Sequence, residues 1–301
     1  MSVNKHALLD EYAKLLQTSG GKVITDKIAD VSALDVLIVV DMQNDFVPVE
    51  DAPKGGKFGV AEGASASQYC VKLIEAFARK GSKIVASKDY HPDCHVSFNT
   101  RNGPFPPHCI QGSPGSAFFP PVRDALMKVK STAGSNLHIV HKGFHEDIDS
   151  FGAFPYKKEQ VDSRPLSCAN RDCCPLWTGG YELKCSSQDQ NIDAPPDILS
   201  ILPERRKTMK EVIDSGARGD PLKQRIFVCG LAMDFCCLDT IVNAGHQGYS
   251  ELYLVLDATR AAHVPGAGKY GSGFLTNPAD MVKLMTAAKA KIVRASAIGI
   301  K

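Results

Sequence analysis

Six short apolar segments recur along the chain, with amphipathic segments between them. They are VLIVVD from residue 36, SKIVAS from 82, LHIVHK from 137, QRIFVC from 224, ELYLVLD from 251 and KIVRA from 291. Each is almost continuously apolar rather than alternating between apolar and polar residues. This pattern is typical of strands that are buried on both faces of a parallel sheet.

The segments between the predicted strands have helical periodicity. They cover residues 62–80, 120–130, part of 200–215, 235–247 and 277–289, and the last of these starts with Asn277 as a cap and Pro278 at the first helical position. Alternating strands and helices predict a doubly wound α/β fold with a six-stranded, mainly parallel sheet and helices on both faces. Active sites of such folds lie at the carboxyl ends of the strands.

One long region interrupts this alternation. Residues 155–222 have little strand pattern and contain the only tryptophan and four cysteines in a C-x4-C-C-x10-C arrangement (Cys168, Cys173, Cys174, Cys185). Because a loop of this length is unusual inside a compact domain, we interpret it as an insertion within a single domain of residues 1–301. It is either a surface elaboration or, because of its cysteines, a second zinc site.

Composition narrows the range of functions. The chain has 301 residues, 44% hydrophobic and 23% charged, with a formal net charge of +2, so nucleic acid and anionic membranes are not expected partners. No apolar run approaches the roughly 20 residues that span a bilayer. The amphipathic, acid-containing start MSVNKHALLDEYAKLLQ resembles no signal peptide, which predicts a cytoplasmic protein. Its ten cysteines are then expected to be reduced rather than paired as in a secreted protein.

Polar residues follow the first and third predicted strands. Asp41 ends VLIVVD, with Asp45 four residues later, and Lys142 ends LHIVHK. Asp41 is a candidate general base if burial or its neighbours tune it, although it could equally cap a turn. Lys142 could hold a thiolate or a carboxylate by its charge, although most lysines are solvated.

The second predicted strand is followed by possible metal ligands. Asp89, His91 and His95 form a D-x-H-x3-H cluster in KDYHPDCH, and His108 follows in PFPPHC. One carboxylate with two or three imidazoles suits zinc, iron or manganese. The alternative is a set of surface histidines in a loop.

The fourth predicted strand leads into GLAMDFCCLDT, residues 230–240. On a helix, Cys237 shares an apolar face with Leu238 and Ile241, whereas Cys236 falls on the more polar side next to Thr240. Cys236 is therefore the candidate nucleophile, and the helix dipole is expected to lower the pKa of its thiol. The alternative is that both are buried, inert thiols.

Five stretches occur together in an order that resembles the isochorismatase-like hydrolase superfamily, and within it the nicotinamidase family. They are VVDMQNDF, KDYHPDCHVSF, PFPPHCIQGSPG, HKGFHEDIDSFGAF and CGLAMDFCC. The resemblance implies a Rossmann-like fold, one divalent metal ion, most often Zn²⁺ but also Fe²⁺ or Mn²⁺, and a homo-oligomer. It implies hydrolysis of nicotinamide to nicotinate and ammonia in NAD salvage, through a cysteine thioester.

The resemblance also implies a role for individual residues. Asp41, Lys142 and Cys236 match the catalytic triad, and Ala232 and Cys236 match the donors of an oxyanion hole that follows a cis peptide bond at Leu231–Ala232. The remaining matches are to metal ligands (Asp89, His91, His108, with His95 possible) and to residues that line the ring pocket (Phe46, Phe105, Phe151).

Two other functions are compatible with parts of the sequence. A related amidase that acts on carbamoyl or ureido compounds would use the same triad, but the full metal cluster favours a pyridine ring. A non-catalytic scaffold built on the cysteine-rich insertion would leave the triad unexplained.

Overall fold

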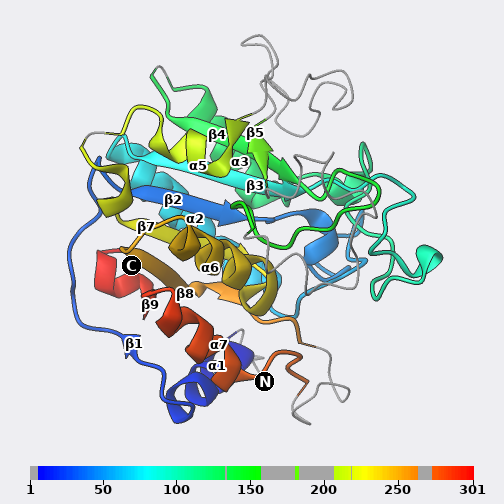
Figure 1. Ribbon diagram of the computed structural model, residues 1–301, viewed down its shortest axis with the longest axis horizontal. Coiled ribbons are helices and arrows are strands. Elements are labelled where there is room, and N and C mark those ends of the chain that lie inside the picture. The colour runs from blue at the N-terminus through cyan, green and yellow to red at the C-terminus, as the bar shows by residue number, and fades with distance from the viewer. Residues whose placement is uncertain (1–5, 133, 157–179, 183–206, 218, 264–272) are drawn as a thin grey trace.

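The computed structural model describes residues 6–132, 134–156, 180–182, 207–217, 219–263 and 273–301. Within these residues, nine strands form one sheet in the order β1-β9-β8-β7-β2-β3-β4-β5-β6 (Figure 1). Neighbouring strands from β1 to β4 are parallel, and β4-β5-β6 pair antiparallel. The strands are β1 (Val23–Ile24), β2 (Val36–Val40), β3 (Lys83–Asp89), β4 (Leu137–Lys142), β5 (Tyr181–Glu182), β6 (Lys207–Thr208), β7 (Ile226–Leu231), β8 (Leu252–Arg260) and β9 (Lys291–Val293).

The six predicted strands are all present, and the prediction of a mainly parallel sheet is confirmed. The described sheet contains three more strands than predicted. The additional strands, β1, β5 and β6, have only two residues each. A segment that short has no periodicity by which a sequence could reveal it.

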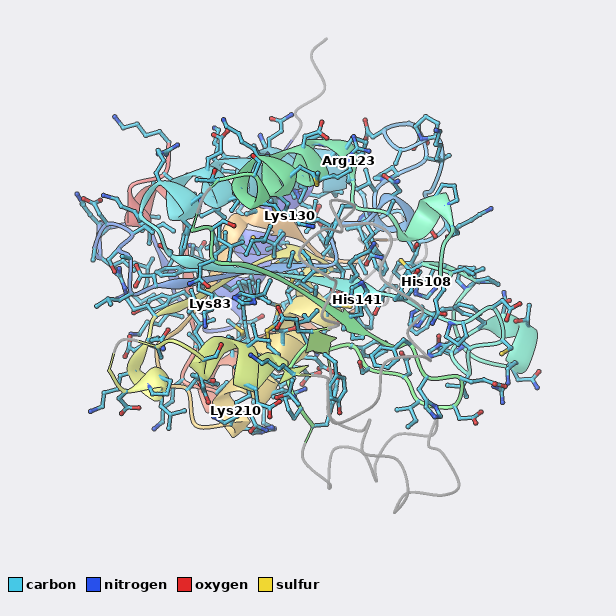
Figure 2. The ribbon with its side chains drawn as sticks, turned by 90° about the horizontal axis from the view of Figure 1, so that it is seen from above. Lys83, His108, Arg123, Lys130, His141 and Lys210 are labelled. Carbon is cyan, nitrogen blue, oxygen red and sulfur yellow. The ribbon has the colours of Figure 1, made fainter. Side chains whose placement is uncertain are left out.

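Helices cover both faces of the sheet. They are α1 (Ala7–Thr18), α2 (Gly63–Arg79), α3 (Pro120–Lys130), α5 (Met209–Asp214), α6 (Leu238–His246) and α7 (Pro278–Ala287). Helices α2 and α3 pack on one face, and α1, α5, α6 and α7 pack on the other. Seen from above, Arg123 and Lys130 of α3 lie on the opposite side of the sheet from Lys210 of α5 (Figure 2).

Strand β2 shows why the apolar runs are continuous. Leu37 and Val39 belong to the core under α2 and α3, whereas Val36, Ile38 and Val40 belong to the core under α1, α6 and α7. Successive side chains of a strand point to opposite faces. Because both faces are covered here, every position must be apolar.

The start of one helix, the helix after β7, differs from the prediction. Asn277 caps α7 as predicted, since its Oδ1 accepts a hydrogen bond from Ala279 N at 2.8 Å. The helix predicted for 235–247 instead begins with a π-helical turn, Met233–Cys237, and α6 starts at Leu238. This wide turn forms where the N–H groups of Phe235 and Cys237 both donate to the carbonyl of Ala232.

Most of the predicted insertion, residues 155–222, lies outside the described residues, as do its four cysteines and Trp177. Its bounds and its possible zinc site therefore stay predictions. Of its described parts, β5 and β6 extend the sheet beyond β4, and α5 packs on the face that α1, α6 and α7 also cover. Lys83 of β3 donates hydrogen bonds to the carbonyls of Val212, Ile213 and Ser215, and so holds the end of α5.

The cysteines of the described residues are all free thiols (Cys70, Cys94, Cys109, Cys229, Cys236, Cys237). This agrees with the expectation of reduced cysteines. In the same part of the chain, no helix combines the length and the apolar character needed to cross a membrane.

Candidate active site

The candidate catalytic side chains come from four strands that lie side by side in the sheet. Asp41 follows β2, Asp89 ends β3, Lys142 ends β4, and Cys236 lies in the turn after β7. Because these strands are parallel neighbours, their carboxyl ends lie together at one end of the sheet, where active sites of this fold are found. The structure thus brings together residues that are up to 195 positions apart, counting from 41 to 236.

Asp41 is completely buried, and its two carboxylate oxygens have different partners. Its Oδ1 accepts a hydrogen bond of 2.6 Å from the hydroxyl of Ser87, and its Oδ2 lies 2.8 Å from Nζ of Lys142. Among the described residues, Oδ2 accepts no hydrogen bond of regular geometry. A lone pair of Oδ2 is therefore available to receive a proton.

Lys142 is the centre of the site. Its buried Nζ forms an ion pair with Asp41 and another with Asp89, lies 3.7 Å from Sγ of Cys236, and donates to the carbonyl of Ser150 at 3.3 Å. Burial alone lowers the pKa of Lys142, but the two carboxylates outweigh it and hold that pKa well above its ordinary value. The lysine is therefore a fixed positive charge between the thiol and the carboxylates.

The two carboxylates that share Lys142 have opposite pKa shifts. Burial raises the pKa of Asp41 to about 6, although the charge of Lys142 opposes this. Burial also acts to raise the pKa of Asp89, but the charges of Lys142 and His91 outweigh it and lower that pKa below its ordinary value. Two acids with separated pKa values are suited to different tasks. Asp41 can exchange a proton near neutral pH, whereas Asp89 stays charged.

Cys236 lies in the π-helical turn and is 5% exposed. The expectation that its thiol pKa is lowered was wrong. Burial raises the pKa of Cys236 well above its ordinary value, even though Lys142 acts to lower it. Charge on sulfur is disfavoured in a site from which water is excluded. The thiol therefore starts as neutral S–H and needs a base, which Asp41 can supply.

Its neighbour Cys237 is fully buried in the core under α6, where Thr259 Oγ1 lies 3.9 Å from its Sγ. Only Cys236 borders the cavity described below. The structure thus places Cys236 at the cavity and Cys237 in the core. The peptide bond Leu231–Ala232 is cis, at the position that the resemblance implied.

Asp89, His91 and His108 are all buried, and each offers one ligand atom within 4.8 Å of the others. The Nδ1 of His91 lies 2.7 Å from the carbonyl of Gly143, and Nδ1 of His108 lies 2.7 Å from the carbonyl of Pro106. A carbonyl can only accept, so Nδ1 carries a hydrogen in both rings, and in the neutral form of each ring Nε2 has the lone pair that a metal ion needs. One carboxylate and two oriented imidazoles fit a divalent transition metal.

His95 has a different environment. Its Nε2 lies 3.1 Å from the carbonyl of Ile148, and its Nδ1 lies 2.7 Å from the hydroxyl of Ser97, so both ring nitrogens have partners. Its ring stacks on His91 at 4.1 Å. A second group, His91, His95 and Asp149, also places its ligand atoms within 4.8 Å. Asp149 was missed in the sequence, where it is one of three acids in HEDIDS.

A cavity lined by aromatic rings opens onto the thiol. Its lining residues are Phe46, Phe58, Asp89, Phe105, His108, Phe151, Ala232, Phe235 and Cys236. Phe105 contacts Phe58 and Phe151 edge to face, with ring centroids 5.6 and 5.9 Å apart. Aromatic walls of this kind favour contact with another flat ring, and the thiol of Cys236 lies in the same wall as the candidate metal ligands Asp89 and His108.

The cavity includes the three predicted pocket residues, and it also includes Phe58 and Phe235, which the sequence reasoning missed. Phe235 directly precedes Cys236 and could have been found from that position. Phe58 lies in KFGV, far from any strand end, and gave no signal.

Two further polar residues hold the acidic residues in place, Ser87 through the carboxylate of Asp41 and Gln43 through the backbone of Asp89. Ser87 is bonded to Asp41, and the amide of Gln43 donates to Asp89 O at 2.7 Å and accepts from Asp89 N at 2.8 Å. Ser87 is a polar residue near the end of β3, and Gln43 lies two residues after Asp41, and these positions were the available signal. Asp45 has a structural role, since its carboxylate accepts from the backbone N–H of Cys109 at 2.8 Å.

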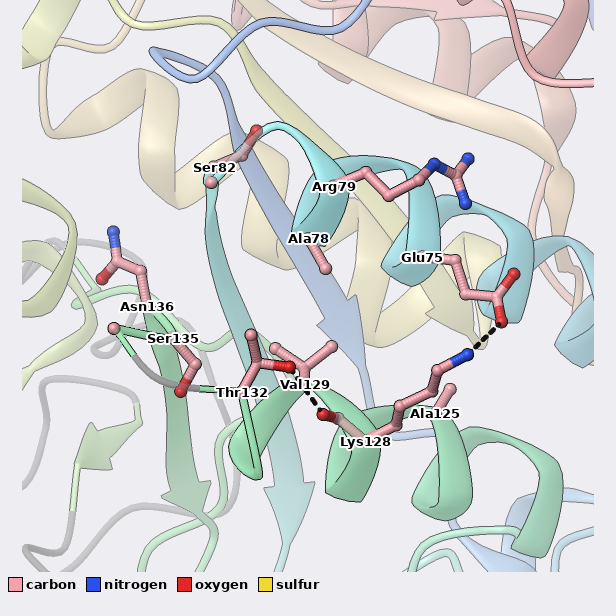
Figure 3. Close-up of a pocket in the computed structure, with 12 residues that line it drawn as sticks. Glu75, Ala78, Arg79, Ser82, Ala125, Lys128, Val129, Thr132, Ser135 and Asn136 are labelled. Carbon is pink, nitrogen blue, oxygen red and sulfur yellow. Dashed lines mark hydrogen bonds and ion pairs between the residues drawn. The ribbon is translucent and has the colours of Figure 1, made fainter.

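A larger cavity, with a volume of about 400 Å³, lies between the ends of α2 and α3 (Figure 3). It is bordered by Ser82 and Asn136, which directly precede β3 and β4. It therefore lies at the amino ends of the strands, opposite to Cys236 at their carboxyl ends. Lys128 and Glu75 form an ion pair of 3.7 Å at its rim. Its twelve lining residues include no cysteine or histidine, so size alone does not mark the catalytic centre.

Comparison with known proteins gives a consistent result. Residues 35–133 match the model of the isochorismatase domain. The chain is 32% identical over 243 residues to a nicotinamidase of Escherichia coli (strain K12), covering 76% of this chain and 84% of that protein.

Solved structures share the fold at lower identity. PnC1 from L. infantum in complex with nicotinate is 24% identical, with a TM-score of 0.55 and coverage of 90% of this chain and 98% of that one. The pyrazinamidase of Pyrococcus horikoshii in complex with zinc is 23% identical, with a TM-score of 0.51 and coverage of 87% and 99%. These two structures show the shared fold. The 32% identity to the Escherichia coli enzyme over 76% of the chain shows that the chain belongs to the nicotinamidase family of isochorismatase-like hydrolases.

Proposed function

We propose that the protein hydrolyses nicotinamide to nicotinate and ammonia, with Asp41, Lys142 and Cys236 as its catalytic residues. The observation that carries this proposal is the contact of Lys142 with both the thiol of Cys236 and the carboxylate of Asp41, beside a cavity lined by aromatic rings. A neutral thiol beside a base with a raised pKa is the arrangement required for covalent catalysis by cysteine.

The first half of the reaction forms a thioester. Asp41 takes the proton of the Cys236 thiol, and the sulfur attacks the carboxamide carbon. The N–H groups of Ala232 and Cys236 stabilise the oxyanion of the tetrahedral intermediate. Asp41 then returns the proton to the departing ammonia. Lys142 stays charged throughout and offsets the negative charge that moves between sulfur and carboxylate.

The second half releases the acid. Asp41, again ionised, takes a proton from a water molecule that attacks the thioester carbonyl. The same two N–H groups hold the second tetrahedral intermediate, and its collapse gives nicotinate. The sulfur leaves as a thiolate and recovers its proton from Asp41, so that the enzyme returns to its starting state.

Asp89, His91 and His108 would hold the divalent metal ion, for which zinc is the first candidate. When bound, the ion supplies a Lewis-acidic position for the pyridine nitrogen, which orients the carboxamide toward the thiol. The aromatic side chains Phe46, Phe105 and Phe151 form the walls against which the ring packs.

The proposed function is tested by ammonia release from nicotinamide by the purified, metal-loaded protein. We expect saturable release with nicotinate as the second product. Absence of release by a folded, metal-loaded protein would reject nicotinamide as the substrate, and carbamoyl and ureido compounds would then be assayed with the same protein.

Removal of the metal is expected to lower this activity. Prolonged chelation, or His108→Ala, should reduce bound metal and bring kcat/KM below about a tenth of its original value, since ligand-shell changes commonly cost about 10–100-fold. Metal content by mass spectrometry and ammonia release are measured on the same samples. The matched control is His138→Gln on β4, whose ring is bonded to Glu182 and lies outside the site; full activity in metal-free protein would contradict the proposal.

The pH dependence is expected to reflect Asp41. Its pKa is raised to about 6 by burial, and only the ionised carboxylate can accept the thiol proton. The value of kcat/KM should therefore rise with pH through about 6 and level off above it. Metal content must be measured at each pH to separate loss of the ion from protonation of the base. A profile that stays flat down to pH 4.5 in metal-loaded protein would exclude Asp41 as the base.

A further inference from the structure

The loop that follows β4 forms one wall of the candidate active site. Ser150 in this loop accepts a hydrogen bond from Lys142 Nζ through its carbonyl, at 3.3 Å. The next residue, Phe151, lines the cavity and contacts the ring of Phe235, with centroids 5.7 Å apart. The position of residues 150–154, which we call the wall loop, therefore affects both the catalytic lysine and the width of the cavity.

The wall loop lies directly on α6. A Cβ added to Gly152 would be 2.8 Å from Nδ2 of Asn243 and 2.9 Å from the backbone carbon of Asp239, so only glycine allows this approach. Asn243 also donates through Nδ2 to the carbonyl of Phe154 at 3.2 Å. Helix α6 is the same helix that follows the turn of the nucleophile.

One side chain of α6 contacts both the wall loop and the nucleophile. Thr240 is completely buried, and its hydroxyl donates to the carbonyl of Cys236 at 2.6 Å. The same oxygen accepts a hydrogen bond of 3.1 Å from the N–H of Ala153. The hydroxyl is thus a one-atom bridge between the residue that carries the reacting sulfur and the loop that carries Phe151.

A second hydrogen-bonded link joins the wall loop to α6. The hydroxyl of Tyr156 donates to Oδ2 of Asp239 at 3.0 Å and accepts from the N–H of Gly152. This link is only partly buried. It holds the outer part of the loop, whereas Thr240 holds the part nearest to the thiol.

We propose that Thr240 is a positioning residue for the amide hydrolysis: its hydroxyl fixes the distance between the Cys236 thiol and the pocket wall that Phe151 provides. This inference deepens the proposed function and rests on it. Thr240 is not among the residues that line the cavity. It acts through the Cys236 carbonyl on one side and the Ala153 N–H on the other.

The decisive comparison is Thr240→Val with Thr240→Ser. Valine keeps the shape but removes the hydroxyl, which leaves a buried N–H without its acceptor and lets the wall loop shift. We expect KM for nicotinamide to rise about tenfold or more with a smaller change in kcat, because the ring loses its fixed wall while the triad remains. Serine keeps the hydroxyl and should restore KM to within about threefold of the original.

The matched control is Thr286→Val on α7. Thr286 donates to the carbonyl of Val282, four residues earlier, at 2.8 Å, which is the same kind of bond as Thr240 makes to Cys236. It is exposed and is not among the residues that line the cavity. It should leave KM unchanged. Thermal unfolding of all three variants shows whether each remains folded at the assay temperature.

A second measurement does not depend on turnover. The rate of Cys236 alkylation by iodoacetamide, and its protection by nicotinate, are followed by mass spectrometry. In Thr240→Val we expect alkylation to proceed while the nicotinate concentration that gives half protection rises about tenfold. An unchanged KM and unchanged protection in folded Thr240→Val would overturn the inference. If the original protein is protected by nicotinate but does not hydrolyse nicotinamide, the proposed function fails, while the comparison of protection still tests Thr240.

Discussion

Replacing Cys236 with alanine is expected to abolish the hydrolysis of nicotinamide, with kcat lowered on the order of 10⁴-fold or more. In the proposed mechanism this side chain supplies the atom that forms the thioester, and no other described thiol borders the aromatic cavity. Ammonia release in single- and multiple-turnover assays measures the loss. Because Cys236 is buried at the end of the cavity, the variant should still fold and still bind nicotinate.

The adjacent cysteine provides the control. Cys237→Ala removes a sulfur that is fully buried in the core under α6, so we expect a loss of about 1 kcal/mol in the free energy of unfolding and most of the activity retained. Mass spectrometry of the protein during turnover should show an acyl adduct on Cys236 alone. Equal loss of activity in both variants, with the fold intact, would refute the assignment of the nucleophile.

Replacing Asp41 with asparagine is expected to have the second largest effect, a decrease of kcat on the order of 10³-fold. Asparagine has nearly the same shape but cannot take the thiol proton, and burial keeps the thiol of Cys236 neutral. Alkylation of Cys236 should slow in parallel, because the thiolate forms only with a base beside it.

The control for this change lies in the same segment of the chain. Asp45→Asn keeps an oxygen that can accept from the N–H of Cys109, and Asp45 has no contact with the thiol or with Lys142 in the structure. It should retain most of the activity. Full activity of a folded Asp41→Asn protein would show that another group acts as the base.

Much of the fold could be predicted because strands that are buried on both faces of the sheet are continuously apolar in sequence. The run VLIVV of β2 is apolar at every position since alternate residues enter two different cores. The short strands β5 and β6 could not be predicted. Tyr181 and Glu182 pair with β4 only because the tertiary structure brings the chain back beside that strand.

The candidate site was found for a related reason. Asp41, Lys142 and Cys236 each follow an apolar run, and parallel topology brings the ends of such runs to one edge. Residues that reach the site from elsewhere were missed, such as Phe58 from a loop and Asp149 from the segment after Lys142. Their positions depend on the path of loops, for which local sequence carries little information.

The sequence by itself determined the six predicted strands, the helices between them and the residues at the strand ends, because these follow from periodicity and from chain order. It also predicts Cys236 rather than Cys237 as the nucleophile, a choice that the two alanine variants test. Only the tertiary structure decided the protonation chemistry. Burial raises the pKa of the Cys236 thiol instead of lowering it, and it separates the pKa values of Asp41 and Asp89 around one lysine. The energy of a charge depends on the solvent and the charges around it, and that environment exists only once distant parts of the chain have packed together.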